Sequence, residues 1–277
     1  MSTDAGRAAD PTPDPFAPFL SVVIPAYNEE HRLPRTLETV AAYLRSRPYP
    51  CELLVVDDGS DDSTCDAAEQ VIRAQRMNEG NLRTQVIHNP HQGKGYTVRT
   101  GMLAAQGAYV LFSDADLSTP IEDLEKLLPW LTRGGKRQGR YEVAIGSREG
   151  AGAVRYDEPF YRHLMGRVFN LAVRLLAIGK IQDTQCGFKM FTRAAAHDLF
   201  SRLQLYGVNS GPVKGAMVTA FDVEVLYLAG KRGYKVREVP VEWRHFEGSK
   251  VNPVKDSIRN FTDILKVRIN DIRGKYN

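Results

Sequence analysis

Hydrophobic and polar positions divide the chain after residue 18 into an ordered series of strand and helix patterns. Five short segments predict strands, because most of them are apolar runs bounded by turn residues. These strands are expected at 19–25, 51–57, 82–88, 108–112 and 141–145. Longer segments with helical spacing lie between them. These helices are expected at 34–46, 63–77, the stretch ending at Gln106, and 121–131.

This regular alternation with short links predicts an α/β fold. Strands that alternate with helices form a mostly parallel, Rossmann-like sheet with right-handed crossovers and helices on both faces. In such sheets, ligands bind in a crevice outside the carboxyl ends of the strands. Functional residues are therefore expected in the loops that follow the strands.

The second half of the chain has a different pattern. A long apolar helix with several arginines is expected at 160–178, and residues 183–191 turn into a strand. Further helices are expected at 193–203 and 221–230, followed by an extended segment, 234–243, that is broken at Pro240. The chain ends in a basic amphipathic helix, 253–273, with Ile258, Phe261, Leu265 and Ile269 at helical spacing.

Composition narrows the class of protein. Of 277 residues, 43% are hydrophobic and 25% charged, which predicts a packed core. The net charge of +4 is too small to indicate nucleic-acid binding. Cys51, Cys65 and Cys186 are far apart and show no spacing typical of a zinc site, so we expect reduced thiols and a cytoplasmic protein.

The chain has no expected membrane span, because no apolar run reaches the roughly 18 residues needed to cross a bilayer. Residues 1–18 are proline-rich and acidic and lack the apolar core of a signal peptide. We interpret them as a disordered leader.

Asp114 and Asp116 carry the most specific chemistry. They follow the apolar strand 108–112, and their spacing lets both carboxylates leave one face of the chain. Two neighbouring carboxylates favour a cation between them, and Mg²⁺ or Mn²⁺ prefers such oxygen ligands together with substrate phosphates. An isolated Asp-x-Asp is more often a solvated turn in which Asp116 or Ser118 caps the next helix.

Other loops at the same edge of the predicted sheet supply complementary groups. Each alone has a structural explanation, such as turn formation for aspartates before glycine. Together they suit a nucleoside diphosphate, since Lys94 at a helix N-terminus can bind phosphate and an aspartate can accept from a base or ribose. The residues in these loops are Tyr27, Glu29, Asp57, Asp58, Lys94, Asp114 and Asp116. Neither a dinucleotide-binding glycine motif nor a P-loop is present.

With these motifs, the sequence resembles the family 2 glycosyltransferases of the GT-A fold. The resemblance rests on VIPAYNEE at 23–30, VVDDGS at 55–60, GKG at 93–95 and DAD at 114–116. Segments 183–191, 221–226 and 241–251 further resemble the dolichyl-phosphate β-glucosyltransferase group. The resemblance implies one GT-A domain at 19–250, with a nucleotide half at 19–148, an acceptor half at 149–250 and a C-terminal helix at 251–277.

The resemblance also implies roles for individual residues. Pro25, Tyr27 and Glu29 would line the uridine pocket, and Asp57, with Asp58 beside it, would lie at the base or ribose. Lys94, Asp114, Ala115 and Asp116 would hold the diphosphate and the metal, and Arg148 would face a donor or acceptor phosphate. Related mannosyltransferases have a glutamine as a third metal ligand where this chain has Ser118. Either Ser118 or a water then completes the metal shell.

The expected reaction is inverting transfer of glucose from UDP-glucose to a polyprenyl (dolichyl) phosphate. This acceptor is already an anion and needs little help from a base. Asp183 and Asp222 are candidates for orienting the acceptor or the sugar hydroxyls, and structural hydrogen bonding is their alternative role. Eukaryotic members of the group carry an N-terminal membrane helix, whereas residues 1–18 here are polar. Contact with lipid is therefore expected at the membrane surface, on the inner face of the cell membrane.

Several alternatives remain open at this point. The helices at 160–178 and 253–273 can either contact lipid or pack on the domain. The transferase could use another nucleotide sugar or a soluble acceptor, such as a sugar or a glyceric acid derivative. A nucleotidyltransferase is disfavoured by the sequence after the first strand, 26–30. A non-catalytic module is disfavoured by the joint presence of Lys94, Asp114 and Asp116.

Overall fold

The computed structural model describes residues 17–132, 141–156, 181–207, 213, 220–245 and 253–276, and for 253–258 the backbone alone. Several predicted features lie outside the described residues. They are most of the leader 1–18, the helix 160–178 and the end of the segment 241–251.

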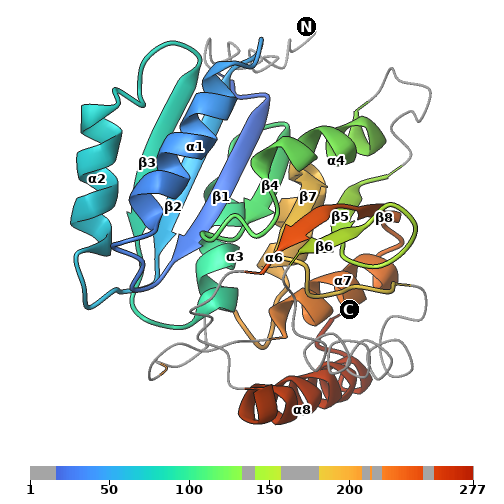
Figure 1. Cartoon of the computed structure of the whole chain (residues 1–277). Coiled ribbons are helices and arrows are strands. Elements are labelled where there is room, and N and C mark those ends of the chain that lie inside the picture. Colours follow the sequence, from blue (N-terminus) through green and yellow to red (C-terminus); the bar gives the residue numbers. More distant parts are fainter. Residues whose placement is uncertain are drawn as a thin grey trace, which may run out of the picture.

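A seven-stranded sheet forms the centre of the molecule (Figure 1). Its spatial order is β3-β2-β1-β4-β7-β5-β8, and β7 alone among these strands runs antiparallel to its neighbours. The strands are β1 (Leu20–Ala26), β2 (Cys51–Asp57), β3 (Leu82–His88), β4 (Tyr109–Ser113), β5 (Val143–Ser147), β7 (Phe188–Thr192) and β8 (Val236–Pro240). The predicted mostly parallel α/β sheet is confirmed.

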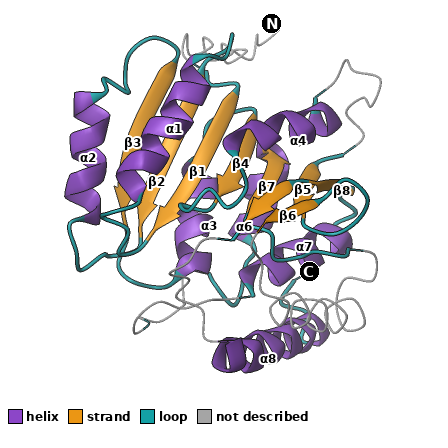
Figure 2. Cartoon of the chain, viewed as in Figure 1, coloured by secondary structure: helices purple, strands orange, loops and turns teal. Residues whose placement is uncertain are grey.

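Helices cover both faces of the sheet (Figure 2). One face carries α1 (Leu33–Arg45), α2 (Thr64–Ala74) and α4 (Leu124–Leu131), the last preceded by the 3₁₀ turn Ile121–Asp123. The other face carries α3 (Lys94–Ala104), α6 (Arg193–Ser201) and α7 (Phe221–Lys231). Alternate residues of the central strands enter opposite cores: Ile24 packs in the first and Val23 in the second. This double burial explains why the strands are continuous apolar runs.

Pro25 lies inside β1, whereas the sequence predicted that it would end the strand. The carbonyl of Ala26 accepts a hydrogen bond from Asp58 N, so Ala26 faces β2 and Pro25 faces β4. Pairing with β4 ends at Val23. The missing N–H of Pro25 therefore costs no ladder bond, and the strand continues by one residue.

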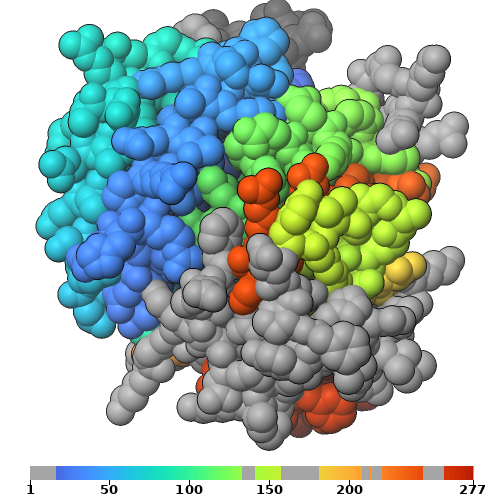
Figure 3. Space-filling view, in the orientation of Figure 1, coloured from blue at the N-terminus to red at the C-terminus, as the bar shows by residue number. Residues whose placement is uncertain are grey.

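The extended segment 234–243 is confirmed, and its break at Pro240 divides it between two sheets. Residues before the break form β8 in the main sheet. Those after it form β9 (Glu242–Arg244), which pairs with β6 (Val154–Tyr156) in a separate two-stranded ribbon. Figure 3 shows β6 in yellow-green and β9 in orange-red, side by side at the surface.

The C-terminal helix, α8 (Pro253–Ile272), packs beside α7 (Phe221–Lys231), and hydrogen bonds flank this contact. Tyr206 Oη donates to Asp263 Oδ2 at 2.5 Å, and Tyr276 Oη donates to Glu224 Oε1 at 2.6 Å. Ile264 is fully buried there. Three of the four apolar residues that the sequence placed at helical spacing, Phe261, Leu265 and Ile269, face outward.

Candidate active site

Lys94 and Asp114 bring together the ends of two segments far apart in sequence. Asp114 follows β4, and Lys94 opens α3 after Gly93, whose φ of +88° suits glycine. Lys94 Nζ lies 2.6 Å from Asp114 Oδ1. Burial lowers the Lys94 pKa, but attraction to Asp114 outweighs it and the pKa lies above its ordinary value. Burial, with repulsion from Asp116, raises the pKa of Asp114.

Asp116 connects this pair to the loop after β1. Ser118 N donates to Asp116 Oδ1 at 2.9 Å, and Arg32 Nη1 lies 3.9 Å from the other oxygen, Oδ2. Arg32 also pairs with Glu29, at 3.0 Å. Ala115 is held between them, because its carbonyl accepts from Thr36 Oγ1 at 2.6 Å. The predicted residues of these two loops therefore lie close together.

Asp58 has a structural task that the sequence did not reveal. Its carboxylate is buried and accepts hydrogen bonds from the backbone N–H groups of Gln92, at 3.0 Å, and Gly93, at 3.0–3.1 Å. His91 Nδ1 lies 2.9 Å from Asp58 Oδ2. These contacts fix the loop that presents Lys94, and the direct role of Asp58 at a nucleotide stays a prediction.

Tyr27 and Asp57 lie at the carboxyl ends of β1 and β2, on the same edge of the sheet as Asp114. The Tyr27 ring stacks on His91, with centroids 4.1 Å apart and planes inclined by 6°. Burial raises the Tyr27 pKa, and nearby aspartates add to the shift. Asp57 accepts from Ser60 N at 3.1 Å and from Ser60 Oγ at 2.5 Å. The carboxyl edge of the sheet thus carries an aromatic ring and a buried carboxylate in addition to Lys94 and Asp114.

Arg148 and Asp183 form a second, tightly bonded pair. Arg148 Nε and Nη2 donate to the two oxygens of Asp183 at 2.7 and 2.9 Å, and Arg148 N donates at 2.9 Å. Asp183 is fully buried. Burial alone would raise its pKa, but Arg148 holds the pKa well below its ordinary value. A carboxylate so engaged is suited to positioning Arg148 and not to accepting a proton.

Asp222 is likewise paired, with Lys189. Lys189 Nζ donates to Asp222 Oδ1 at 2.5 Å and to the carbonyl of Cys186, and both side chains are buried. Lys94 Nζ and Lys189 Nζ lie 5.6 and 5.9 Å from the centroid of the Phe112 ring. Asp222 is close enough to raise the pKa of Lys94, so it belongs to the charge cluster around Asp114.

Residues 21–200 match the profile described as Glycosyl transferase family 2. The chain belongs to this family. The predicted resemblance and the predicted glycosyltransferase class are thereby confirmed.

Individual relatives of this family 2 glycosyltransferase cover most of its length. Dolichyl-phosphate beta-glucosyltransferase of Drosophila melanogaster is 35% identical over 93% of this chain and 76% of its own length. The Homo sapiens protein of the same name is 34% identical over 93% and 77%. Among solved structures, glucosyl-3-phosphoglycerate synthase from Mycobacterium tuberculosis with Mg²⁺ and UDP has a TM-score of 0.60 at 17% identity, over 91% and 79%. Its identity is too low to indicate more than the shared GT-A fold.

Gly187 and Lys189 contact predicted site residues, Asp114 and Asp222, and the sequence did not single them out. The carbonyl of Gly187 accepts from Asp114 N at 3.1 Å. A Cβ at position 187 would lie 2.0 Å from Asp114 Oδ2, so only glycine leaves room for the carboxylate there. Both residues lie in the segment 183–191, which resembles the glucosyltransferase group. The one sequence feature that could have indicated Lys189 is its place between apolar residues of a predicted strand.

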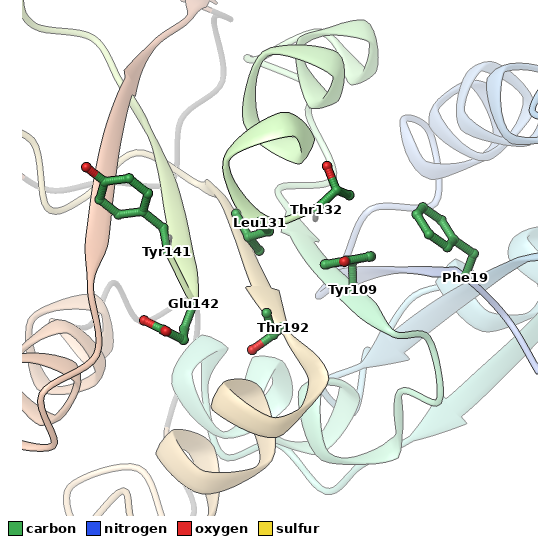
Figure 4. A pocket seen from close by; sticks show the side chains of 7 residues that line it. All are labelled: Phe19, Tyr109, Leu131, Thr132, Tyr141, Glu142 and Thr192. Atoms are coloured by element: carbon green, nitrogen blue, oxygen red, sulfur yellow. The ribbon is translucent and has the colours of Figure 1, made fainter. Parts of the chain in front are cut away.

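A cavity of about 510 Å³ lies at the other end of the sheet (Figure 4). It is bordered by residues at the amino ends of the parallel strands, among them Phe19, Tyr109 and Glu142. No predicted site residue lines it. The glycosyltransferase site is therefore assigned by its charged residues at the carboxyl ends and not by the size of this hollow.

Replacing Asp183 with Asn is expected to lower the free energy of unfolding by about 3 kcal/mol or more at pH 7, because it breaks a buried ion pair. The pKa of Asp183 is lower in the folded state than the roughly 3.9 of an unfolded chain. Its contribution is therefore fully present above that value and is lost as pH falls through the folded-state pKa. Denaturant unfolding of wild type and Asp183→Asn at pH 7, 5 and 3 measures this.

The difference between the two proteins should stay constant from pH 7 to about 5 and shrink only in stronger acid. Asp66→Asn, at an exposed position of α2, is the matched control and should change stability little. A difference that already disappears between pH 7 and 5 would contradict the assigned ion pair.

Proposed function

We propose that this family 2 enzyme transfers glucose from UDP-glucose to a polyprenyl (dolichyl) phosphate, with inversion and with a divalent metal. The observation that carries the proposal is the group formed by Lys94, Asp114 and Asp116 at the carboxyl ends of the parallel strands. The acceptor and the sugar are taken from the relatives named dolichyl-phosphate beta-glucosyltransferase, which match over most of the chain.

The donor would lie across the carboxyl ends of β1, β2 and β4. Pro25, Tyr27, Glu29 and Asp57 are assigned to the uridine end. Lys94 is assigned to the diphosphate, since its ammonium lies at the N-terminus of α3 and the helix dipole favours an anion there. In this proposal the sugar would face the side of Arg148.

Asp114 and Asp116 fit Mg²⁺ or Mn²⁺. Both offer hard oxygen donors, and Gly187 leaves open the space beside Asp114 that a Cβ would fill. Such an ion, when bound, supplies positive charge against the leaving diphosphate. Ser118 or a water remains the third ligand in this proposal.

The described residues serve the reaction mainly through charge and position. Lys94 stabilises the charge that develops on the departing UDP. Asp183 and Trp243 hold the Arg148 guanidinium, whose carbon lies 5.4 Å from the Trp243 ring centroid, and Arg148 would bind a phosphate. Asp222 is engaged by Lys189 and would act in positioning. An ionised lipid phosphate attacks without a strong general base.

Radiolabelled UDP-glucose tests this proposal. With polyprenyl phosphate and Mg²⁺, label is expected to enter the organic phase, and GDP-mannose or UDP-N-acetylglucosamine should give much less product. Chelation of the metal should stop transfer. Label that enters only the aqueous phase, with a phosphorylated glyceric acid or a sugar as acceptor, would replace the lipid acceptor by a soluble one.

A lipid acceptor requires contact with a membrane. Among the residues the structure describes, no helix is both long and apolar enough to span a bilayer. We assign the contact to the outer face of α8, where Phe261, Leu265 and Ile269 are 40–44% exposed and Ile272 is 81% exposed. Lys266 and Arg268 lie exposed on the same helix, Arg273 lies exposed directly after it, and these cations match an anionic surface. Figure 3 shows part of α8 at the surface, in red at the bottom.

The triple variant Phe261→Ser, Leu265→Ser, Ile269→Ser is expected to bind anionic vesicles at least about tenfold more weakly. Each half-exposed apolar side chain that enters the interface contributes about 0.5–1 kcal/mol. Flotation with vesicles rich in phosphatidylglycerol measures the loss, and added salt should weaken binding of both proteins. Deleting residues 253–277 would be a poor test, because it removes Asp263 and Tyr276, which are bonded to Tyr206 and Glu224.

The double variant Val154→Ser, Tyr156→Ser is the control for this test. These side chains are similarly exposed, at 39% and 41%, but lie on β6. Its flotation should match that of wild type. Equal flotation of wild type and the α8 triple variant would remove the assignment of α8 to the membrane.

A further inference from the structure

Three side chains with different ligand atoms converge beside the end of β2. A carboxylate oxygen of Asp57, Sγ of Cys65 and a ring nitrogen of His88 all lie within 4.8 Å of one another. The cluster is open on one side, since Asp57 is buried, Cys65 is half-buried and the His88 side chain is 57% exposed. An ion from solvent can therefore reach all three.

The backbone holds the three residues in place without help from a ligand. Asp57 and His88 are register partners at the ends of β2 and β3, so both side chains leave the same face of the sheet. Cys65 lies in the first turn of α2, which covers that face. Ligands fixed on two strands and a helix need little reorganisation on binding.

The distances fit a tetrahedral ion. Zn–S and Zn–N bonds of about 2.3 and 2.0 Å place sulfur and nitrogen about 3.5 Å apart in a tetrahedral site. Cys65 Sγ lies 3.3 Å from His88 Nδ1. On the other side of the ring, His88 Nε2 faces Glu69 Oε1 at 3.9 Å. A carboxylate behind a histidine is the usual arrangement when the other nitrogen binds a metal.

We propose that Asp57, Cys65 and His88 form a binding site for a borderline divalent cation such as Zn²⁺, with water as the fourth ligand. Binding forms bonds from the metal to Sγ, Nδ1 and a carboxylate oxygen. The thiol proton of Cys65 passes to solvent, and His88 binds as the neutral imidazole with its remaining proton on Nε2.

The site differs in chemistry from the Asp114–Asp116 pair. Thiolate and imidazole favour Zn²⁺ or Co²⁺ over Mg²⁺, which prefers oxygen. Without a cation, burial and then Asp57 raise the pKa of the Cys65 thiol to about 12, so the thiol stays protonated. The ligands come from three separate segments, which is why their spacing in the sequence gave no zinc motif.

Asp57 is shared between this site and the uridine end of the donor. This step rests on the proposed function: if Asp57 binds the base or ribose, a cation on Asp57 competes with UDP. Borderline cations would then weaken donor binding through Cys65 and His88, whereas Mg²⁺ would not. The site is thus an inhibitory one for the transferase.

Titration of the full chain with Co²⁺ in excess Mg²⁺ tests the metal site directly. Wild type should show the intense visible bands of tetrahedral Co²⁺ and a thiolate-to-cobalt charge-transfer band. Cys65→Ser should lose the charge-transfer band, and His88→Gln should bind at least about tenfold more weakly. His197→Gln, at an exposed position on α6, and Asp116→Ala should keep both signals.

Thermal melting of each variant without metal checks that it is folded. If Cys65→Ser has a lower melting temperature than wild type, His88→Gln, at an exposed position, decides the test. No charge-transfer band in wild type, or a band that persists in folded Cys65→Ser, overturns the site. Unchanged affinity in His88→Gln overturns the assignment of His88.

Calorimetric titration with UDP in Mg²⁺, with and without stoichiometric Zn²⁺, tests the competition. Zn²⁺ should lower UDP affinity at least about tenfold in wild type and have little effect in Cys65→Ser. Equal affinities in wild type would overturn the sharing of Asp57. A protein that binds no UDP at all would overturn the proposed function, whereas the cobalt spectrum would still decide the metal site.

Discussion

Asp116→Ala is expected to lower kcat/KM for glucosyl transfer by at least about 10³-fold while the protein stays folded. Loss of one preorganised electrostatic contact at a leaving group typically costs about 10²–10³. Asp116 is also assigned to the metal, so the variant loses charge from the ion as well. The described contacts of its carboxylate are a hydrogen bond from Ser118 N and the distant Arg32, which are small for stability.

Steady-state transfer and Mn²⁺ affinity are the two measurements for this variant. The transfer rate and the Mn²⁺ affinity should fall together, because Asp116 is assigned to the ion that the transfer requires. Asp66→Ala removes one acidic side chain from an exposed position of α2 and should leave both unchanged. Undiminished turnover by folded Asp116→Ala would refute the assignment of Asp116 to the metal.

Local pattern was sufficient to predict the strands and the site-bearing loops of the nucleotide half. β1, β2 and β4 are buried on both faces, so their apolar runs carry the signal regardless of neighbours. Parallel pairing then brings their carboxyl ends to one edge, and Lys94 and Asp114 meet there as expected. Alternation of elements alone therefore located the charged edge.

Local sequence pattern could not predict the roles of residues whose partners lie far away in the sequence. The role of Asp58 at a nucleotide stays a prediction, whereas the hydrogen bonds that its carboxylate accepts from the backbone of the loop before Lys94 were visible only in the structure. For Asp183 the sequence left open whether it orients substrate or makes structural hydrogen bonds, and the structure shows both its oxygens bonded to Arg148. A carboxylate near a loop looks the same in sequence whether it faces a ligand or another segment.

The acceptor half shows the same limit at the level of elements. β7 lies antiparallel between β4 and β5. Its pairing with β4 joins residues some eighty positions apart in sequence, and hydrophobic periodicity does not report such a pairing. α8 carries an apolar stripe on one side and polar residues such as Asp263 on the other. The side that packs combines the buried Ile264 and Val267 with Asp263, which accepts a hydrogen bond from Tyr206. Amphipathic pattern alone left open whether the apolar stripe packs on the domain or contacts lipid.

Gly187→Ala is expected to lower kcat/KM by at least about 10²-fold, although residue 187 has no side chain to act on substrate. The new Cβ would lie 2.0 Å from Asp114 Oδ2 and 2.3 Å from Asp114 Cγ. The carboxylate must then move by about an ångström, a displacement that costs about 10² in rate when it affects a reacting group. Gly187 cannot retreat freely, since its carbonyl accepts from Asp114 N.

A second mutation distinguishes this mechanism from general damage to the fold. In an Asp114→Ala background the Cβ meets no carboxylate, so Gly187→Ala should cost little further activity, and the two effects should be strongly non-additive. Gly230→Ala, where nothing lies within 4 Å of the new Cβ, should keep activity and can stabilise α7 by up to about 1 kcal/mol. Additive losses in the double variant would mean that Gly187 acts on the site by a route other than the placement of Asp114.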